Sequence, residues 1–346
     1  MRIITLSLFF PLAIVSFAQH DTTYYKEYND KLIISLYNSF ARQNDIAFSQ
    51  NIVKDTAGKS PFHYYADADI VSGIEFDYDI FGIAFAYKAV PPKNAFKKGK
   101  TYYTDLGLNA GGNKWRLETS YKRYEGFYDT NTPNYTPFYS DSAPYYQNPH
   151  MTTQSMKAKL IYIKKHNKFS YCSAYACSQQ QTKSSFSWIF VSNLYYNRMS
   201  TDTSFVPFPI RNFYAGYSDF NGLNVIGLSV GGGFSVNVVL FHKFFGNLTW
   251  AVEPESQWRK YSYGSGSVSY RAYLKTSGDA RFSFGYNGKK FFFFLSAIAD
   301  HSNYNSGQIM VTNNFMSGST TIGYRFRAKK PSFYKKFENT KVYQWL

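Results

Sequence analysis

In one long stretch of the C-terminal half of the chain, all charged side chains fall on one of the two alternating sets of positions. Between residues 267 and 286 the charges fall only at odd positions, at Arg271, Lys275, Asp279 and Arg281. Side chains two positions apart share one face of an extended strand, so these charges would line a single wall. A wall with a basic excess favours anions. Anion binding or anion passage is therefore the first chemistry that the sequence suggests.

Similar alternation in other stretches adds further charges to this wall. We predict that it carries eight basic and four acidic side chains: Lys114, Arg116, Glu118, Lys122, Glu253, Glu255, Arg259, Arg271, Lys275, Asp279, Arg281 and Arg325. Two interpretations stay open. The charges would favour anions if they line an open lumen, or they would pair across neighbouring strands and fill a closed interior with a polar network.

Hydrolytic and metal chemistry have less support. His301, Ser302 and Asn303 combine the residue types of an activated serine, as a lipid-modifying enzyme would need. Neighbours on a turn rarely converge, so a polar loop explains them as well, and we assign no catalytic residue. Glu253 and Glu255 would suit a cation, although cross-strand pairing is the commoner fate of such carboxylates. The six histidines lack metal-ligand spacing, and we expect no metal and no cofactor.

Very long strands are the elements that would hold the charged wall. The alternation in residues 267–286 never slips, which predicts a single strand of about 20 residues. A strand in a globular protein has about 5 or 6 residues, and a membrane crossing needs about 9–11. Further stretches alternate in the same way: 114–122, 226–240, 248–258 and 310–326. Such lengths favour a membrane barrel over a soluble sandwich.

Short and long connections alternate between the predicted strands. Turn signals and longer polar stretches follow one another along the chain, at 111–113, 129–150, 166–167, 178–185, 242–247, 261–266, 287–288 and 301–307. Outer-membrane barrels show this asymmetry, with short periplasmic turns and longer loops outside. We predict an all-β fold: a transmembrane antiparallel up-and-down β-barrel of about 12 strands, with 10–14 admissible, in the bacterial outer membrane.

Three segments carry specific expectations within this barrel. Residues 44–52 and 168–180 are candidate strands. Residues 198–221 are left unassigned, because Pro207 and Pro209 disfavour a central strand.

Composition agrees with the barrel and excludes other classes. Aromatic residues make up 21% of the chain and charged residues only 17%, against roughly 25% charged in an average soluble domain, which excludes disorder. Mean hydropathy is −0.37, and after residue 19 no apolar run of about 18 residues could cross a membrane as a helix. The net charge of +16 would suggest nucleic acid in a cytosolic chain, but export removes that partner.

The first residues predict export. Met1 and Arg2 form a basic start, residues 3–17 are apolar, and Ser16 and Ala18 suit a cleavage site. We predict a cleaved signal peptide (1–18), a periplasmic lead-in (19–30), the barrel (31–328) and a basic periplasmic tail (329–346).

Two cysteines and three aromatic residues have structural expectations. If Cys172 and Cys177 lie on one strand, they are separated by roughly 16 Å on opposite faces, too far for a disulfide, so both are predicted to be packing residues. Trp250, Tyr324 and Phe326 near strand ends are predicted to join an aromatic girdle at the headgroups of the outer-membrane lipids.

Short aromatic motifs carry a family resemblance. Residues 99–106 (GKTYYTDL), 121–128 (YKRYEGFY) and 202–207 (DTSFVP) resemble a family of Bacteroidota proteins known only as a domain of unknown function. The resemblance implies an outer-membrane barrel and brings no known catalytic or binding residues. Residues 323–326 (GYRF) also look like the signal read by the barrel-insertion machinery, although about 20 residues follow them.

Three functional classes remain open. The barrel would be a passive pore with a net basic polar lumen, or a non-conducting surface barrel whose loop at residues 127–150 binds an unidentified ligand or partner. A lipid-modifying outer-membrane enzyme is the third class.

Overall fold

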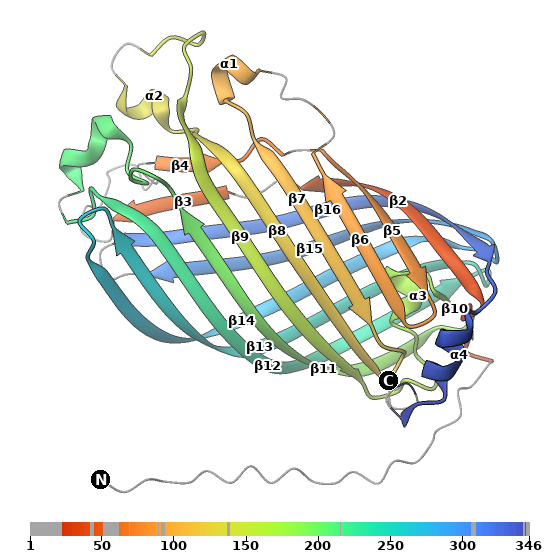
Figure 1. Ribbon diagram of the computed structural model, residues 1–346. Helices are drawn as coiled ribbons and strands as arrows, with labels where there is room; N and C mark the ends of the chain where they lie inside the picture. Colours follow the sequence, from red (N-terminus) through yellow and green to blue (C-terminus); the bar gives the residue numbers. More distant parts are fainter. Residues whose placement is uncertain are drawn as a thin grey trace, which may run out of the picture.

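Twelve long antiparallel strands close into one barrel in the computed structural model (Figure 1). The structure describes residues 23–346 except 42–44, 51–61, 69, 89, 91–93, 137–138, 215, 306–308, 342 and 344–346. The barrel strands are β2 (Lys31–Ala41), β5 (Val71–Tyr78), β6 (Phe81–Tyr87), β7 (Tyr102–Ala110), β8 (Trp115–Asp129), β9 (Tyr146–Ile163), β11 (Ser185–Ser200), β12 (Phe220–Leu240), β13 (Phe244–Tyr263), β14 (Val268–Asn287), β15 (Phe291–Asn305) and β16 (Ile309–Arg327). Each pairs with the next, and β16 closes onto β2. The predicted fold is confirmed.

The outer face of the barrel is apolar all the way round. Every barrel strand carries at least one large apolar side chain that stays exposed, for example Leu36, Phe76, Ile83, Leu108, Leu117, Leu160, Trp188, Leu228, Leu248, Phe282, Leu295 and Ile322. Only a lipid environment favours so much exposed apolar surface, and a closed barrel leaves no backbone edge unpaired in that environment. The chain is a multi-pass β-barrel of the outer membrane.

None of the described helices is long and apolar enough to span a bilayer.

One end of the barrel has tight turns and the other has longer connections. Two residues join β5 to β6, three join β12 to β13, and three join β14 to β15. The first and last described elements, β1 (Tyr25–Glu27) and α4 (Ser332–Glu338), lie at this same end (Figure 1). Short turns mark the periplasmic rim. The extracellular end carries α1 (Ala95–Lys98), α2 (Thr132–Tyr135) and the 3-10 helix η1 (Phe208–Phe213).

Two candidate strands from the sequence do not cross the membrane. Residues 44–52 contain β3 (Asp45–Gln50), which pairs with β4 (Phe62–Tyr65) and bridges β16 to β8 at the extracellular end. The predicted strand at 168–180 is wrong. This segment forms α3 (Cys172–Tyr175) and β10 (Gln179–Gln181), which pairs with β1. It lacks a clean alternation of apolar and polar residues, so neither of its faces suits lipid.

The unassigned residues 198–221 divide between two strands and their connection. β11 continues to Ser200, η1 follows the Pro207 position, and β12 starts at Phe220. The two prolines therefore lie outside the strand ladders, where their missing N–H groups cost no strand pairing.

A β-bulge in β8 marks where that strand leaves the membrane zone. The pairing of β8 with β9 shifts between Glu125 and Phe127, and Gly126 between them has a φ of +88°. A Cβ at this position would lie 2.0 Å from the Lys100 carbonyl oxygen. Only glycine fits both the left-handed conformation and the close approach.

The C-terminal segment packs against the barrel. The hydroxyls of Tyr334 and Tyr343 donate to Oδ2 of Asp79, at 3.0 and 2.6 Å. Lys330 Nζ lies 3.6 Å from the same carboxylate. Burial raises the pKa of Tyr334, so its hydroxyl stays protonated and able to donate. The β5–β6 turn that holds Asp79 therefore anchors α4 beside the periplasmic rim.

Candidate functional site

The periplasmic end of the barrel is filled by the β9–β11 connection. We call residues 164–184, together with β1, the plug; α3 and β10 lie within it (Figure 1). Its glutamines Gln179, Gln180 and Gln181 are all buried. Gln180 Nε2 donates to the Asn287 carbonyl at 2.7 Å, and Asn287 Nδ2 donates to the Gln179 carbonyl at 2.9 Å. The plug thus replaces lumen water with direct hydrogen bonds to the wall.

Arg325 holds the plug from the last strand. Its Nε donates to the Cys177 carbonyl at 3.1 Å, and its Nη2 donates to Asn287 Oδ1 at 2.6 Å. The guanidinium also lies 4.2 Å from the centre of the Tyr28 ring. These contacts satisfy both the charge and the donors of a buried arginine. Arg325 therefore serves to seat the plug.

Five charged side chains meet in the middle of the lumen; we call them the central network. Glu118 accepts from Arg116 Nε at 3.2 Å and from Arg281 Nη1 at 2.8 Å. Asp279 accepts from Arg281 Nε at 3.2 Å and from Lys159 Nζ at 2.5 Å. Three cations and two carboxylates are joined without a break, so most of the charge is neutralised within the group.

The central network joins opposite walls of the barrel. Arg116 and Glu118 project from β8, Lys159 projects from the neighbouring β9, and Asp279 and Arg281 project from β14. Within the ring of twelve strands, β9, β11, β12 and β13 separate β8 from β14 on one side. Direct contacts between β8 and β14 therefore pass through the lumen, not along the wall. The barrel is bridged directly beside the plug, since Arg281 Nη1 also donates to the Tyr171 hydroxyl at 2.9 Å.

Other charges predicted from the sequence pair along neighbouring strands. Glu253 accepts from Ser229 Oγ at 2.5 Å and also from Asn193. Glu255 accepts from Tyr195 and Gln257, and Lys275 Nζ lies 3.9 Å from it.

Arg259 lies on the same interior face of β13 as Glu253 and Glu255. Its Nε donates to Gln257 Oε1 at 2.8 Å, and its guanidinium lies 3.9 Å from the centre of the Tyr273 ring.

Aromatic side chains pack across the extracellular end; we call this cluster the aromatic cap. Phe48 of β3 stacks on Phe62 of β4, with ring centres 4.6 Å apart, and on Phe205 of the β11–β12 connection at 5.5 Å. Phe205 meets Phe220 of β12 at 5.1 Å. All four are fully buried. The same cluster includes residues of the barrel strands β5 to β9, β11 to β13 and β16, so it covers the mouth of the lumen.

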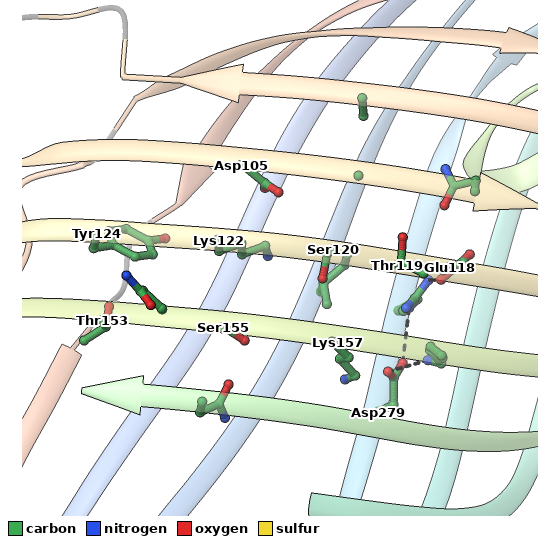
Figure 2. A pocket seen from close by; sticks show the side chains of 18 of the residues that line it. Asp105, Glu118, Thr119, Ser120, Lys122, Tyr124, Thr153, Ser155, Lys157 and Asp279 are labelled. Carbon is green, nitrogen blue, oxygen red and sulfur yellow. Dashed lines mark hydrogen bonds and ion pairs between the residues drawn. The ribbon is translucent and has the colours of Figure 1, made fainter. Parts of the chain in front are cut away.

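A cavity of about 420 Å³ lies between the central network and the aromatic cap. Figure 2 shows Asp105, Lys122, Ser155 and Lys157 projecting into it from β7, β8 and β9. Lys122 is directly opposite both Asp105 and Ser155 in the strand pairing. The floor of the cavity includes Tyr175 of the plug, and the roof of the cavity includes Ile46 and Met199, which pack in the aromatic cap. The cavity is polar at mid-height and apolar toward the extracellular end.

The structure brings some of the predicted charges together and separates others. Arg116, Glu118, Asp279 and Arg281 form most of the central network. Lys114 lies in the turn before β8, and Arg271 is exposed near the extracellular end of β14, so neither joins it.

Sequence reasoning missed Lys159 and the whole plug. Lys159 could have been found, because Lys157 and Lys159 alternate with the outward-facing Met156 and Leu160. The plug offered no periodic signal.

The structure also locates the predicted girdle residues and the proposed serine segment at residues 301–303. Trp250, Tyr324 and Phe326 are exposed on the outer face, and the rings of the last two are in contact, tilted by 57° with their centres 4.8 Å apart. The backbone of His301, Ser302 and Asn303 lies in β15, not in a loop. The signal peptide predicted for residues 1–18 lies outside the described residues.

Both cysteines are free and buried inside the plug, as the packing role requires. They lie in and just after α3, not on a strand. Burial raises the pKa of the Cys177 thiol to about 12 and also raises that of Cys172, so neither forms a reactive thiolate at neutral pH.

We therefore expect no reaction of the folded protein with N-ethylmaleimide at neutral pH, and complete labelling of both thiols after denaturation. Mass spectrometry of the labelled chain measures this. Labelling of the native protein as fast as that of the denatured protein would contradict the buried plug.

The fold and its filled interior define the class: an outer-membrane β-barrel bridged across its lumen. The family model described as a domain of unknown function (DUF4421) matches residues 19–326, and the chain belongs to this family. No curated protein sequence matches the chain.

Several solved barrels resemble the chain distantly. The outer membrane protease OmpT from Escherichia coli is 7% identical over 87% of this chain and 98% of its own, with a TM-score of 0.36. An outer membrane channel from Pseudomonas putida F1 is 9% identical over 89% and 100%, at 0.35. The translocator domain of the autotransporter NalP from Neisseria meningitidis is 9% identical over 86% and 88%, at 0.33. At this distance no property of these proteins is carried over.

Proposed function

We propose that the protein is a non-conducting outer-membrane barrel that acts by binding at its surface, not by passing solutes. The observation that carries the proposal is the central network, which links β8 to β14 through the lumen by the contact of Glu118 with Arg281. The plug lies on its periplasmic side and the aromatic cap on its extracellular side. A passive anion pore would require all three obstacles to move together.

The extracellular end supports the binding role. Phe96 of α1 and Phe208 and Phe213 of η1 are more than 70% exposed, although large aromatic side chains are costly to leave in water. The first part of the loop, residues 129–135, is held by internal hydrogen bonds, because Asp129 accepts from the backbone N–H of Asn131 at 2.8 Å and from the Tyr135 hydroxyl at 2.8 Å. An ordered surface with exposed aromatic groups suits an apolar or carbohydrate partner.

Conductance across a planar lipid bilayer tests the proposal. We expect the purified wild-type protein to give a flat current trace under a salt gradient, while an open porin inserted under the same conditions gives discrete steps. Heat-modifiable gel mobility confirms that the inserted protein is folded. Anion-selective steps from the folded wild type would overturn the proposal and restore the pore hypothesis.

Three finer expectations belong with this proposal. The motif resemblance supports an origin in Bacteroidota. Residues 323–326 at the end of β16 support recognition by the barrel-insertion machinery, and the exposed outer face supports contact with outer-membrane lipids.

A further inference from the structure

The net charge of +16 is distributed unevenly between the two ends of the barrel. The periplasmic connections carry exposed lysines at nearly every turn, namely Lys164, Lys165, Lys168, Lys183, Lys243 and Lys289. Described acidic residues at this end are few, and one of them, Asp79, is already engaged by Lys330, Tyr334 and Tyr343. The periplasmic rim is therefore strongly basic.

The C-terminal segment adds to the same rim. Arg327, Lys329, Lys335, Lys336 and Lys341 are exposed, and none of them forms an ion pair with another described residue. Lys330 is different, because it pairs with Asp79 and Glu338 inside the segment. These exposed cations are therefore available to an external anion.

The position of α4 shows which level of the membrane its exposed lysines face. Phe337 of α4 lies 5.8 Å from Phe81, centre to centre, and Tyr334 lies 6.4 Å from it. Phe81 begins β6 and is exposed on the lipid-facing side of the barrel. The helix therefore lies beside the apolar outer face, at the boundary between hydrocarbon and water, with Lys335 and Lys336 next to it.

Aromatic side chains mark the same boundary on the neighbouring strands. Tyr324 and Phe326 of β16 and Phe291 and Phe293 of β15 are exposed near their periplasmic ends. Aromatic rings at this level anchor a barrel at the lipid headgroups. Lysines immediately beyond such a belt lie within reach of lipid phosphates, and clusters of four to eight cations next to a membrane bind anionic lipid.

We propose that the basic periplasmic rim, with the exposed cations of residues 327–341 as its largest group, binds the phosphate headgroups of anionic phospholipids in the inner leaflet of the outer membrane. The contact of α4 with Phe81 holds its lysines at headgroup level. This inference is independent of whether the barrel conducts.

Native mass spectrometry of the detergent-solubilised full chain tests the proposal. Phosphatidylglycerol and phosphatidylcholine with the same acyl chains are added in equal amounts, and the retained lipid is counted. We expect the wild type to retain phosphatidylglycerol preferentially. In the variant K329Q/K335Q/K336Q/K341Q, the ratio of retained phosphatidylglycerol to retained phosphatidylcholine should fall at least about fivefold, because each cation near an anionic surface contributes a factor of this order.

A matched control separates headgroup binding from a general loss of charge. Lys100, Arg198 and Arg271 are exposed toward the extracellular end, so the variant K100Q/R198Q/R271Q should retain the wild-type preference. High salt should weaken the preference of the wild type, because salt screens exposed charges. Equal retention of the two lipids by the wild type, or equal loss in both variants, would overturn the proposal.

Discussion

Replacing Asp279 by alanine is expected to lower the free energy of unfolding by about 3–5 kcal/mol, the usual cost of leaving a buried charge without its partner. Lys159 Nζ lies 2.5 Å from Asp279 and its side chain is only 4% exposed. Arg281 loses one of its two carboxylates in the same step. Three cations would then share Glu118 alone in the middle of the lumen.

Urea denaturation of the barrel in lipid vesicles, followed by tryptophan fluorescence, measures this loss. Asp279→Asn keeps the shape of the side chain and a hydrogen-bond acceptor but removes the charge, so its loss should be intermediate. Thr276→Ala on the outer face of the same strand is the matched control and should change the stability by less than about 0.5 kcal/mol. If Asp279→Ala were as mild as the control, the network would be hydrated and the bridged lumen would be wrong.

Phe205→Ala is expected to destabilise the extracellular end by about 3–5 kcal/mol, as for other fully buried phenylalanines. Phe205 is fully buried, its ring contacts Phe48 and Phe220, and its carbonyl accepts from the Tyr64 hydroxyl at 2.8 Å. Removing the ring leaves a void between β3, β12 and the β11–β12 connection. Proteolysis of the extracellular loops should become faster in proportion to this loss.

Phe208→Ala is the control for the aromatic cap. Phe208 lies three residues away on η1 but is 75% exposed, so its removal should change neither urea stability nor proteolysis. Equal effects of the two substitutions would show that the cap is not a packed cluster.

The barrel was predictable because lipid enforces a strict pattern. Each residue of β14 faces either hydrocarbon or the interior, so the alternation from Val268 to Asn287 appears directly in the sequence. The number of strands followed from counting such stretches. The charges of the interior were predictable for the same reason, as Arg116, Glu118 and Arg281 show.

The pairing of those charges was not predictable, because it depends on contacts across the lumen. Glu118 and Arg281 are 163 positions apart, so from the sequence both an open anion pathway and a closed polar interior stayed open. The plug escaped detection for a different reason. Its buried side chains contact the plug itself as well as the wall: the Ser170 N–H donates to Gln181 Oε1, while Asn237 of β12 donates to the Ser170 carbonyl and Arg116 of β8 to Cys172 Sγ. No face of this segment therefore repeats.

The hydrogen bonds of Arg325 to the plug also imply a sequence of steps during assembly. Cys177 lies in the middle of the chain, whereas Arg325 lies near the end of the last strand. The Cys177 carbonyl and the Asn287 amide oxygen gain this donor only when β16 arrives to pair with β2. Ring closure and the final seating of the plug are thus one event, and a nascent barrel that still lacks β16 keeps an incompletely satisfied interior.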